Sequence, residues 1–110
     1  MMEWSPDFRI SKGKGARIIR LGVDDKSVWA GIVINGQSIA FDSTRHSHKP
    51  LSVQIYADCI CICMHIKVQR GYMAPIVVWL RKHGVEVDID ADSVHAPDLI
   101  ELTASQGNSR

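Results

Sequence analysis

The chain has 110 residues, of which 45% are apolar and 23% are charged, with 13 Lys and Arg against 12 Asp and Glu. This length predicts a single domain, and the composition excludes bulk disorder, a collagen repeat and a simple coiled coil. A formal charge of +1 gives the whole molecule no attraction to nucleic acid or to an anionic membrane. Either partner would need a local basic patch, and neither is expected.

No targeting signal or membrane-spanning segment is visible in the sequence. Residues 1–7 include an acid where a signal peptide is basic, and the most apolar stretch, residues 53–68, is interrupted by polar side chains. Cys59, Cys61 and Cys63 are an odd number of closely spaced cysteines, which is not the pattern of a disulfide scaffold. We therefore expect reduced thiols and a cytoplasmic protein.

The N-terminal residues carry little pattern. Residues 1–15 show no clear periodicity and include the basic, glycine-containing run 12–15, so we expect a flexible N-terminal arm. Residues 16–23 alternate imperfectly between apolar and polar side chains, which predicts a first strand. The α+β domain itself is predicted to span residues 16–102, followed by a disordered tail over 103–110.

The strongest local signal is that of a β-hairpin. Residues 27–34 and 37–42 are rich in β-branched and aromatic side chains, and Asn35 and Gly36 lie between them. A type I′ turn needs positive φ at both central residues, and an Asn-Gly pair supplies it. Regular pairing through this turn is expected to place Phe41 on the same face as the apolar side chains of residues 27–34.

Residues 50–70 fit two structures. As a helix, the segment has Pro50 in its first turn and Gly71 just past its end, and its polar residues form one stripe. As strands, it shows two-residue alternation from Cys59 onward and many β-branched residues, but it needs a break near Asp58. The caps and the stripe favour a helix over 50–70, and the strand interpretation stays open.

The C-terminal part of the chain contains a second segment with the start and stop residues of a helix, and a strand pattern follows it. Residues 75–83 begin with Pro and end with basic residues before Gly84, which predicts a short helix. Residues 85–90 alternate valine or isoleucine with acids, which predicts a half-exposed strand. Residues 97–102 are expected to form one short closing helix.

These elements predict an α+β fold in one small two-layer domain. An antiparallel, hairpin-based sheet would pack on two helices and so bury both the apolar strand faces and the apolar helix stripes. The predicted strands cover residues 16–23, 27–34, 37–42 and 85–90, and the predicted helices cover residues 50–70 and 75–83.

Charge is unevenly distributed along the second half of the chain. Residues 45–83 carry six basic side chains and one acid, whereas residues 84–102 carry six acids and no base. The strand 85–90 would lie near a sheet edge, where backbone pairing can add a strand from a partner. We therefore predict a binding surface for another protein, whose identity the sequence does not give. Its candidate residues are Glu86, Asp88, Asp90 and Asp92.

Self-association is the second predicted interaction. Helix 75–83 is apolar over most of its circumference, which is more than one small sheet can cover, so we expect a homodimer. On both grounds, the preferred function is that of a small intracellular binding protein without catalysis, of the accessory or inhibitor type.

A divalent-metal nuclease is the alternative function. The order of a hairpin, a helix and a strand that ends in acids resembles the order in ribonuclease H-like enzymes. In that family, carboxylates from separate elements converge on two Mg²⁺ ions that activate water. The resemblance implies one carboxylate before the hairpin, Asp24 or Asp25, then Asp58, and then one of Asp88, Asp90 and Asp92. Of these, Asp24, Asp58 and Asp90 are the catalytic carboxylates that we assign to this alternative.

No metal site or cofactor is predicted. On a strand, Cys59, Cys61 and Cys63 would form a line, and on a helix they would spread around the axis, so neither conformation gathers them around one ion. Cysteine is also a common small apolar core residue, and we expect these thiols to be packed inside the domain. His46 and His48, in a polar loop, are the remaining candidate metal donors.

Overall fold

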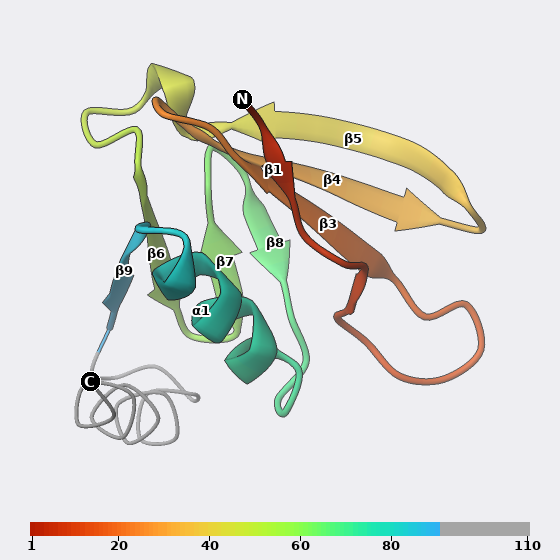
Figure 1. The fold of residues 1–110 in the computed structure, drawn as a ribbon. Coiled ribbons are helices and arrows are strands. Elements are labelled where there is room, and N and C mark those ends of the chain that lie inside the picture. Colours follow the sequence, from red (N-terminus) through yellow and green to blue (C-terminus); the bar gives the residue numbers. More distant parts are fainter. Residues whose placement is uncertain (91–110) are drawn as a thin grey trace.

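The computed structural model describes residues 1–90, which form two β-sheets and one α-helix (Figure 1). In chain order the elements are β1 (Glu3–Trp4), β2 (Phe8–Arg9), β3 (Ile18–Val23), β4 (Val28–Ile34), β5 (Gln37–Ser43), the 3₁₀ turn η1 (Thr44–His46), β6 (Ser52–Tyr56), β7 (Cys59–Cys61), β8 (His65–Lys67), α1 (Met73–Lys82) and β9 (Glu86–Ile89). The helix predicted over 97–102, the tail predicted over 103–110 and the predicted end of the domain at 102 lie outside the described residues.

The first sheet, called sheet A, is antiparallel and has the strand order β1–β3–β4–β5, with β2 also pairing with β3. The predicted hairpin is confirmed, because β4 and β5 pair on either side of Asn35 and Gly36. The φ angles of these two residues are 51° and 77°. Both central residues of the turn therefore have the positive φ that a type I′ turn requires.

A β-bulge changes the face of sheet A on which Phe41 lies. The pairing of β4 with β5 shifts between Ile32 and Val33, so that Phe41 pairs with Gly31. Regular pairing from the turn would have put Phe41 opposite Ala30, whose side chain is buried. The prediction that Phe41 lies on the core face is therefore wrong, because one inserted residue moves the following side chains to the other face of the sheet.

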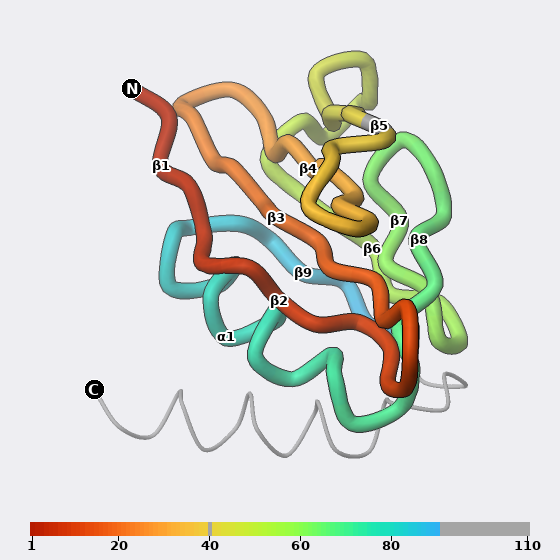
Figure 2. Tube along the Cα trace, turned by 90° about the vertical axis from the view of Figure 1, so that its right-hand side faces the viewer, coloured from red at the N-terminus to blue at the C-terminus, as the bar shows by residue number. Residues whose placement is uncertain are grey.

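The N-terminal segment 1–15, which we expected to be a flexible arm, contributes to sheet A. Figure 2 shows β1 and β2 running alongside β3, and both pair with it in an antiparallel manner. Ile10 is fully buried, and its carbonyl oxygen accepts a hydrogen bond from the backbone N–H of Gln69 at 2.9 Å. The ring of Phe8 lies edge-on to that of Trp79 in α1, with centroids 6.5 Å apart. These contacts connect the segment to the second half of the domain.

The helix predicted over residues 50–70 is wrong, since the segment forms the three short antiparallel strands β6, β7 and β8. Its buried side chains follow a two-residue alternation; they are Val53, Ile55, Ile60, Ile62, Ile66 and Val68. β-Branched residues pack well on a pleated surface, and this preference wins over the stripe of polar residues. Ala57 and Asp58 form the turn between β6 and β7, which is the break that the strand interpretation required.

Helix α1 confirms the helix predicted over 75–83, with limits one or two residues earlier. Pro75 lies in its first turn, where the missing N–H would have had no intrahelical partner. Past its end, Gly84 has a φ of 82°, and the N–H of Val85 donates to the carbonyl oxygen of Leu80 at 3.1 Å. This arrangement is a Schellman motif, so the glycine ends the helix as the sequence indicates.

The second sheet, called sheet B, has the strand order β8–β7–β6–β9. β9 confirms the strand predicted over residues 85–90, but it pairs parallel to β6 and so belongs to a different sheet from the hairpin. Parallel pairing needs a crossover connection, which here includes α1. The predicted single sheet with two helices is therefore corrected to one antiparallel and one mixed sheet, with one α-helix among the described residues.

One buried cluster joins the two sheets and the helix. It contains side chains from β3 and β4 of sheet A, from all four strands of sheet B and from α1. Ile76, Val77 and Leu80, which belong to the apolar helix that suggested a homodimer, are all buried in this cluster. They need no second copy to cover them, and the homodimer stays a prediction. No helix among residues 1–90 is long and apolar enough to cross a membrane.

Candidate functional site

The predicted acidic surface lies on β9, at one edge of sheet B. Glu86 and Asp88 are exposed, whereas Val87 between them is buried in the core cluster. The two carboxylates therefore lie on the open face of the sheet, as the alternation predicted. Asp90 follows the strand and is half-buried, and Asp92 lies outside the described residues.

The outer edge of β9 presents backbone groups. The N–H groups of Glu86 and Asp90 donate to carbonyl oxygens on the β6 side at 3.0 and 2.9 Å. Because alternate residues of a parallel strand bond to the same neighbour, the backbone groups of Val87 and Ile89 face away from β6. Arg81 of α1 donates from Nη2 to the carbonyl oxygen of Val87 at 3.0 Å. The carbonyl oxygen of Val87 is thus covered by the Arg81 side chain, and no described strand pairs with β9 on this side.

Among the described residues, the acids of β9 make one ion pair, and it is exposed. Glu86 Oε1 lies 3.6 Å from Lys49 Nζ, and both side chains are exposed. Exposed ion pairs of this kind contribute about 0–1 kcal/mol and weaken as the salt concentration rises. Asp88 lines a groove of about 380 Å³ beside the loop 47–49. The acidic row is therefore exposed to solvent and accessible to a partner.

The three thiols do not lie in the core. Cys59 and Cys61 are half-buried on the open face of sheet B, and Cys63 is exposed, so the expectation that they pack inside is wrong. The reason is the alternation of β7, in which Ile60 takes the buried position between the first two. Burial raises the pKa of Cys59 and of Cys61, and the negative charge of Asp58 raises that of Cys59 further. Both thiols are therefore held protonated at neutral pH.

The structure does not bring together the three carboxylates that the nuclease resemblance implies. Asp24 lies in the β3–β4 turn of sheet A, whereas Asp58 lies in the β6–β7 turn of sheet B, 3.7 Å from Lys67 Nζ. Asp90 directly follows β9. Within residues 1–90, no group of three or more His, Cys, Asp or Glu side chains is placed to hold one metal ion.

The two candidate histidines lie in and just after η1. His48 lines the same groove as Asp88 and Cys61, but these side chains do not form a metal-binding group in the described part of the chain. We therefore assign no metal ligand to His46 or His48.

An aromatic cluster on the open face of sheet A was missed by the sequence analysis. Trp4 and Phe41 meet edge to face with ring centroids 5.9 Å apart, and they are 48% and 54% exposed. A Cβ atom on Gly22 would lie 2.8 Å from the Trp4 ring, and one on Gly31 would lie 2.8 Å from the Phe41 ring. Glycine at these two positions lets the rings lie directly on the strand backbone. A hollow of about 190 Å³ beside the rings is also lined by Arg20.

The sequence did contain a signal for this cluster. Glycine inside a strand weakens the strand, and it often marks a bulge or the close approach of another group. Gly22 lies within β3 and Gly31 within β4.

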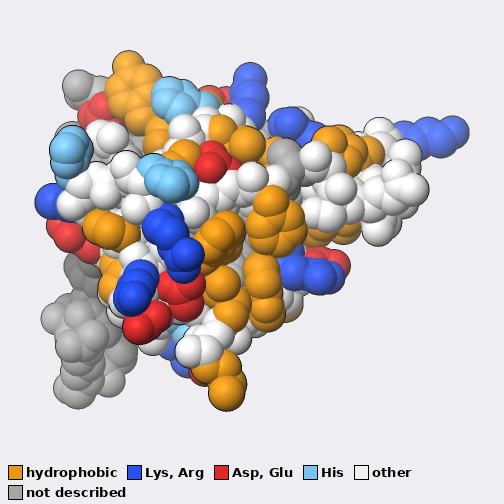
Figure 3. Space-filling view, turned by 90° about the horizontal axis from the view of Figure 1, so that it is seen from above, with side chains coloured by type: hydrophobic (Ala, Val, Ile, Leu, Met, Phe, Trp, Pro, Cys, Tyr) orange, Lys and Arg blue, Asp and Glu red, His pale blue; other side chains and the backbone are white. Residues whose placement is uncertain are grey.

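Figure 3 shows the face of the molecule that is seen from above. On this face, exposed hydrophobic side chains lie between Lys and Arg side chains.

Comparisons of the chain with protein-family models, with curated proteins and with solved structures find no match. We therefore infer its function from the chemistry of its own surfaces.

Proposed function

We propose that this chain is a small, non-catalytic binding protein that holds a basic, extended segment of a partner protein along β9. The observation that carries the proposal is the position of Glu86 and Asp88, which are both exposed on one face of an edge strand. Asp90 continues this row just past the end of the strand.

Backbone pairing supplies the affinity. Val87 and Ile89 direct their N–H and C=O groups toward the outer edge of β9, where an added strand pairs with them. Arg81 holds the carbonyl oxygen of Val87, so the partner either displaces this guanidinium or begins its pairing at Ile89. A side chain in this position also hinders indiscriminate pairing of the edge with other chains.

The carboxylates supply the selectivity. Alternate side chains of an added strand point to the same face as Glu86 and Asp88, so a segment with Lys or Arg at every second position meets them directly. A segment with acids at these positions is repelled. Charge pairs at such an exposed surface speed association and weaken as the salt concentration rises.

Two observations support a role without catalysis. The thiols of Cys59 and Cys61 have raised pKa values, which makes them poor nucleophiles at neutral pH. The carboxylates of Asp24, Asp58 and Asp90 belong to separate parts of the fold and form no described metal-binding group. Since no observation favours the nuclease alternative, we do not propose it.

The test uses a peptide of alternating Lys and Val, long enough to span β9, with a peptide of alternating Glu and Val as its control. Binding to the full chain is measured by fluorescence anisotropy at increasing salt concentration, and amide hydrogen exchange reports on Val87 and Ile89. We expect binding of the basic peptide only, with an affinity that falls with salt and slower exchange at these two amides.

Matched variants separate binding from folding. The double substitution of Glu86→Lys and Asp88→Lys should abolish binding but change the free energy of unfolding by only about 0.5 kcal/mol, because both side chains are exposed. Asp25→Lys, in the β3–β4 turn, reverses a charge elsewhere and should bind the peptide normally. Equal binding of the acidic peptide, or unchanged binding by the double variant, would contradict the proposal.

A further inference from the structure

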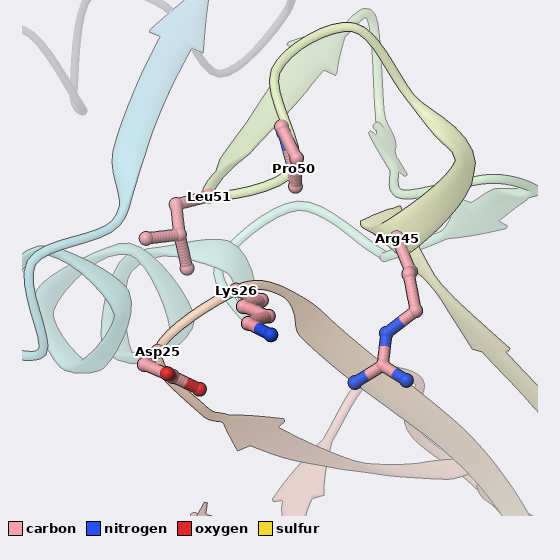
Figure 4. Close-up of a pocket in the computed structure, with 5 residues that line it drawn as sticks. All are labelled: Asp25, Lys26, Arg45, Pro50 and Leu51. Atoms are coloured by element: carbon pink, nitrogen blue, oxygen red, sulfur yellow. The ribbon is translucent and has the colours of Figure 1, made fainter.

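A second candidate site lies where sheet A meets the segment between η1 and β6. A groove of about 550 Å³ separates the β3–β4 turn from this segment. Its lining residues, drawn in Figure 4, are Asp25, Lys26, Arg45, Pro50 and Leu51. The volume falls within the range of about 300–1,000 Å³ that small-molecule sites occupy.

The carboxylate of Asp24 organises the β3–β4 turn at one side of this groove. Its Oδ1 accepts the backbone N–H groups of Lys26 and Ser27, both at 2.7 Å, and its Oδ2 accepts the indole N–H of Trp29 at 3.1 Å. The hydrogen bond from the backbone of Lys26 is the largest cause that lowers the pKa of Asp24, which falls to about 2. The ionised carboxylate thus fixes the turn that carries Asp25 and Lys26.

The guanidinium of Arg45 is held in place by two neighbours. Its Nη2 lies 3.4 Å from Asp24 Oδ2, and its Cζ lies 5.2 Å from the centre of the Trp29 ring. A guanidinium that is both ion-paired and stacked loses little freedom when it binds a ligand. Its remaining N–H donors are available to the groove.

The opposite wall of the groove is tied to the same part of the core. Thr44 is buried, and its hydroxyl oxygen accepts the backbone N–H of Val28 at 2.9 Å. The same hydroxyl donates to the carbonyl oxygen of Pro50. Pro50 and the partly exposed Leu51 form an apolar wall opposite the cations. The groove therefore has Arg45 and its apolar wall in place before a ligand arrives.

The groove offers two cationic side chains to a ligand. Figure 4 shows Asp25 and Lys26 next to each other on the β3–β4 turn and the guanidinium of Arg45 reaching down beside this turn, with Pro50 and Leu51 on its other side. Within residues 1–90, the ammonium of Lys26 has no ion pair or side-chain hydrogen bond. Besides Lys26, Arg45 and Asp25, the ionised carboxylate of Asp24 lies beside the groove and is paired with Arg45. The ammonium of Lys26 is therefore the positive charge that attracts an anion.

We propose that this groove binds a phosphate monoester attached to an apolar or aromatic body, such as a nucleoside monophosphate. The ammonium of Lys26 and the N–H donors of Arg45 that do not face Asp24 donate charge-assisted hydrogen bonds to the oxygens of the monoester. Pro50 and Leu51 cover the apolar body, and Asp25 accepts a hydrogen bond from a hydroxyl or amino group of the ligand. The proposal does not depend on the partner proposed for β9.

The test follows the backbone amides of the isotope-labelled full chain by NMR during titration with adenosine monophosphate, inorganic phosphate, adenosine or benzoate. We expect adenosine monophosphate, and more weakly phosphate, to shift the signals of Lys26, Arg45 and Leu51, and adenosine to leave them in place. Benzoate binding without phosphate binding would overturn the assignment of a phosphate. Shifts scattered over other surfaces, or no shifts at millimolar concentrations, would overturn the site itself.

Substitutions test the role of each charge. Lys26→Ala and Arg45→Ala should each weaken the binding of adenosine monophosphate about tenfold, which is the loss of one charge-assisted contact. Arg45→Lys keeps the charge without the fork and should fall between the wild type and Arg45→Ala. Asp25→Asn should tighten the binding of inorganic phosphate, an increase that damage to the fold would not produce. Lys82→Ala, at the end of α1, is the matched control, and unchanged affinity in both alanine variants would contradict the proposal.

Discussion

The open faces of the two sheets differ in how their side chains are supported. On sheet A, Trp4 and Phe41 rest on the backbone at Gly22 and Gly31 and touch each other edge to face. The open face of sheet B is mainly polar and charged; its residues are Ser52, Gln54, Tyr56, Cys59, Cys61, His65, Lys67, Glu86 and Asp88. One open face therefore carries an aromatic cluster that packs on the backbone, and the other carries mainly polar and charged side chains.

Substitutions on the two open faces should therefore affect different properties, the stability of the fold on sheet A and the recognition of a partner on sheet B. A substitution in the aromatic cluster changes contacts within the domain, whereas a substitution on the open face of sheet B changes mainly what the domain attracts. The buried faces of both sheets contribute to one core cluster, so we expect large losses of stability from substitutions there on either sheet.

The largest expected effect distinguishes the two faces of β7. Ile60→Ala removes a fully buried side chain and should lower the free energy of unfolding by about 2–5 kcal/mol. Cys61→Ala, at the next position but on the open face, should change it by about 0.5 kcal/mol or less. Urea unfolding of the two variants measures the difference. Equal losses would contradict the assignment of residues 59–61 as a strand with one open face.

The two hairpin turns should respond to substitution with opposite signs. Ala57 in the β6–β7 turn has a φ of 54°, and Asn35 in the β4–β5 turn has a φ of 51°. The left-handed conformation is unfavourable for alanine by about 1–2 kcal/mol, but glycine adopts it readily and asparagine tolerates it. Ala57→Gly should therefore raise the free energy of unfolding by about 1 kcal/mol, and Asn35→Ala should lower it by about as much. Thermal unfolding checks both, and a less stable Ala57→Gly variant would show that the alanine is not strained.

A smaller effect is expected where Phe41 covers Gly31. In Gly31→Ala the new methyl group meets the Phe41 ring, 2.8 Å from its nearest atom, so the ring must move. In a Phe41→Ala background the same methyl group meets no ring and should be neutral or stabilising, because alanine restricts the unfolded chain. A double-mutant cycle by urea unfolding should give a coupling of about 0.5–1 kcal/mol. Strict additivity would show that the ring does not depend on the glycine.

The smallest expected effect is a change in stability at acidic pH, and it arises from Asp24 in the β3–β4 turn of sheet A. Asp24 has a pKa of about 2 in the folded chain, against an ordinary value of 3.8. A carboxyl group with a lower pKa in the folded state stabilises the fold above its ordinary pKa, and this contribution is lost as the pH falls from about 4 toward about 2. Asp24→Asn should therefore lose less stability than the wild type over this pH range. Denaturant unfolding at each pH measures both, and parallel losses would count against this role of Asp24.

The local sequence was sufficient to predict those helices and strands whose ends are marked by turn or capping residues. The hairpin was predicted because Asn35 and Gly36 favour positive φ at adjacent positions, and α1 because Pro75 and Gly84 frame it. The alternation of acids with apolar residues likewise predicted β9 and its exposed row. Each of these signals lies within a few positions of the chain.

The candidate sites divide in the same way. The acidic row of Glu86 and Asp88 was predicted because it lies on a single strand. The groove was not, because Lys26, Arg45 and Leu51 come from separate segments that only the fold brings together. The aromatic cluster was missed because it depends on β1 joining sheet A and on the bulge in the β4–β5 pairing.

The sequence by itself determined where the chain turns and which positions are apolar. Only the tertiary structure decided the conformation of residues 50–70, the face of Phe41 and the pairing of β9 with β6. The polar residues of 50–70 fitted a helical stripe, but the core cluster selects strands, because a sheet buries Ile60 and Ile66 on the same face. The physical reason is that burial depends on which distant residues come together, and neither a local stripe nor a local alternation contains that information.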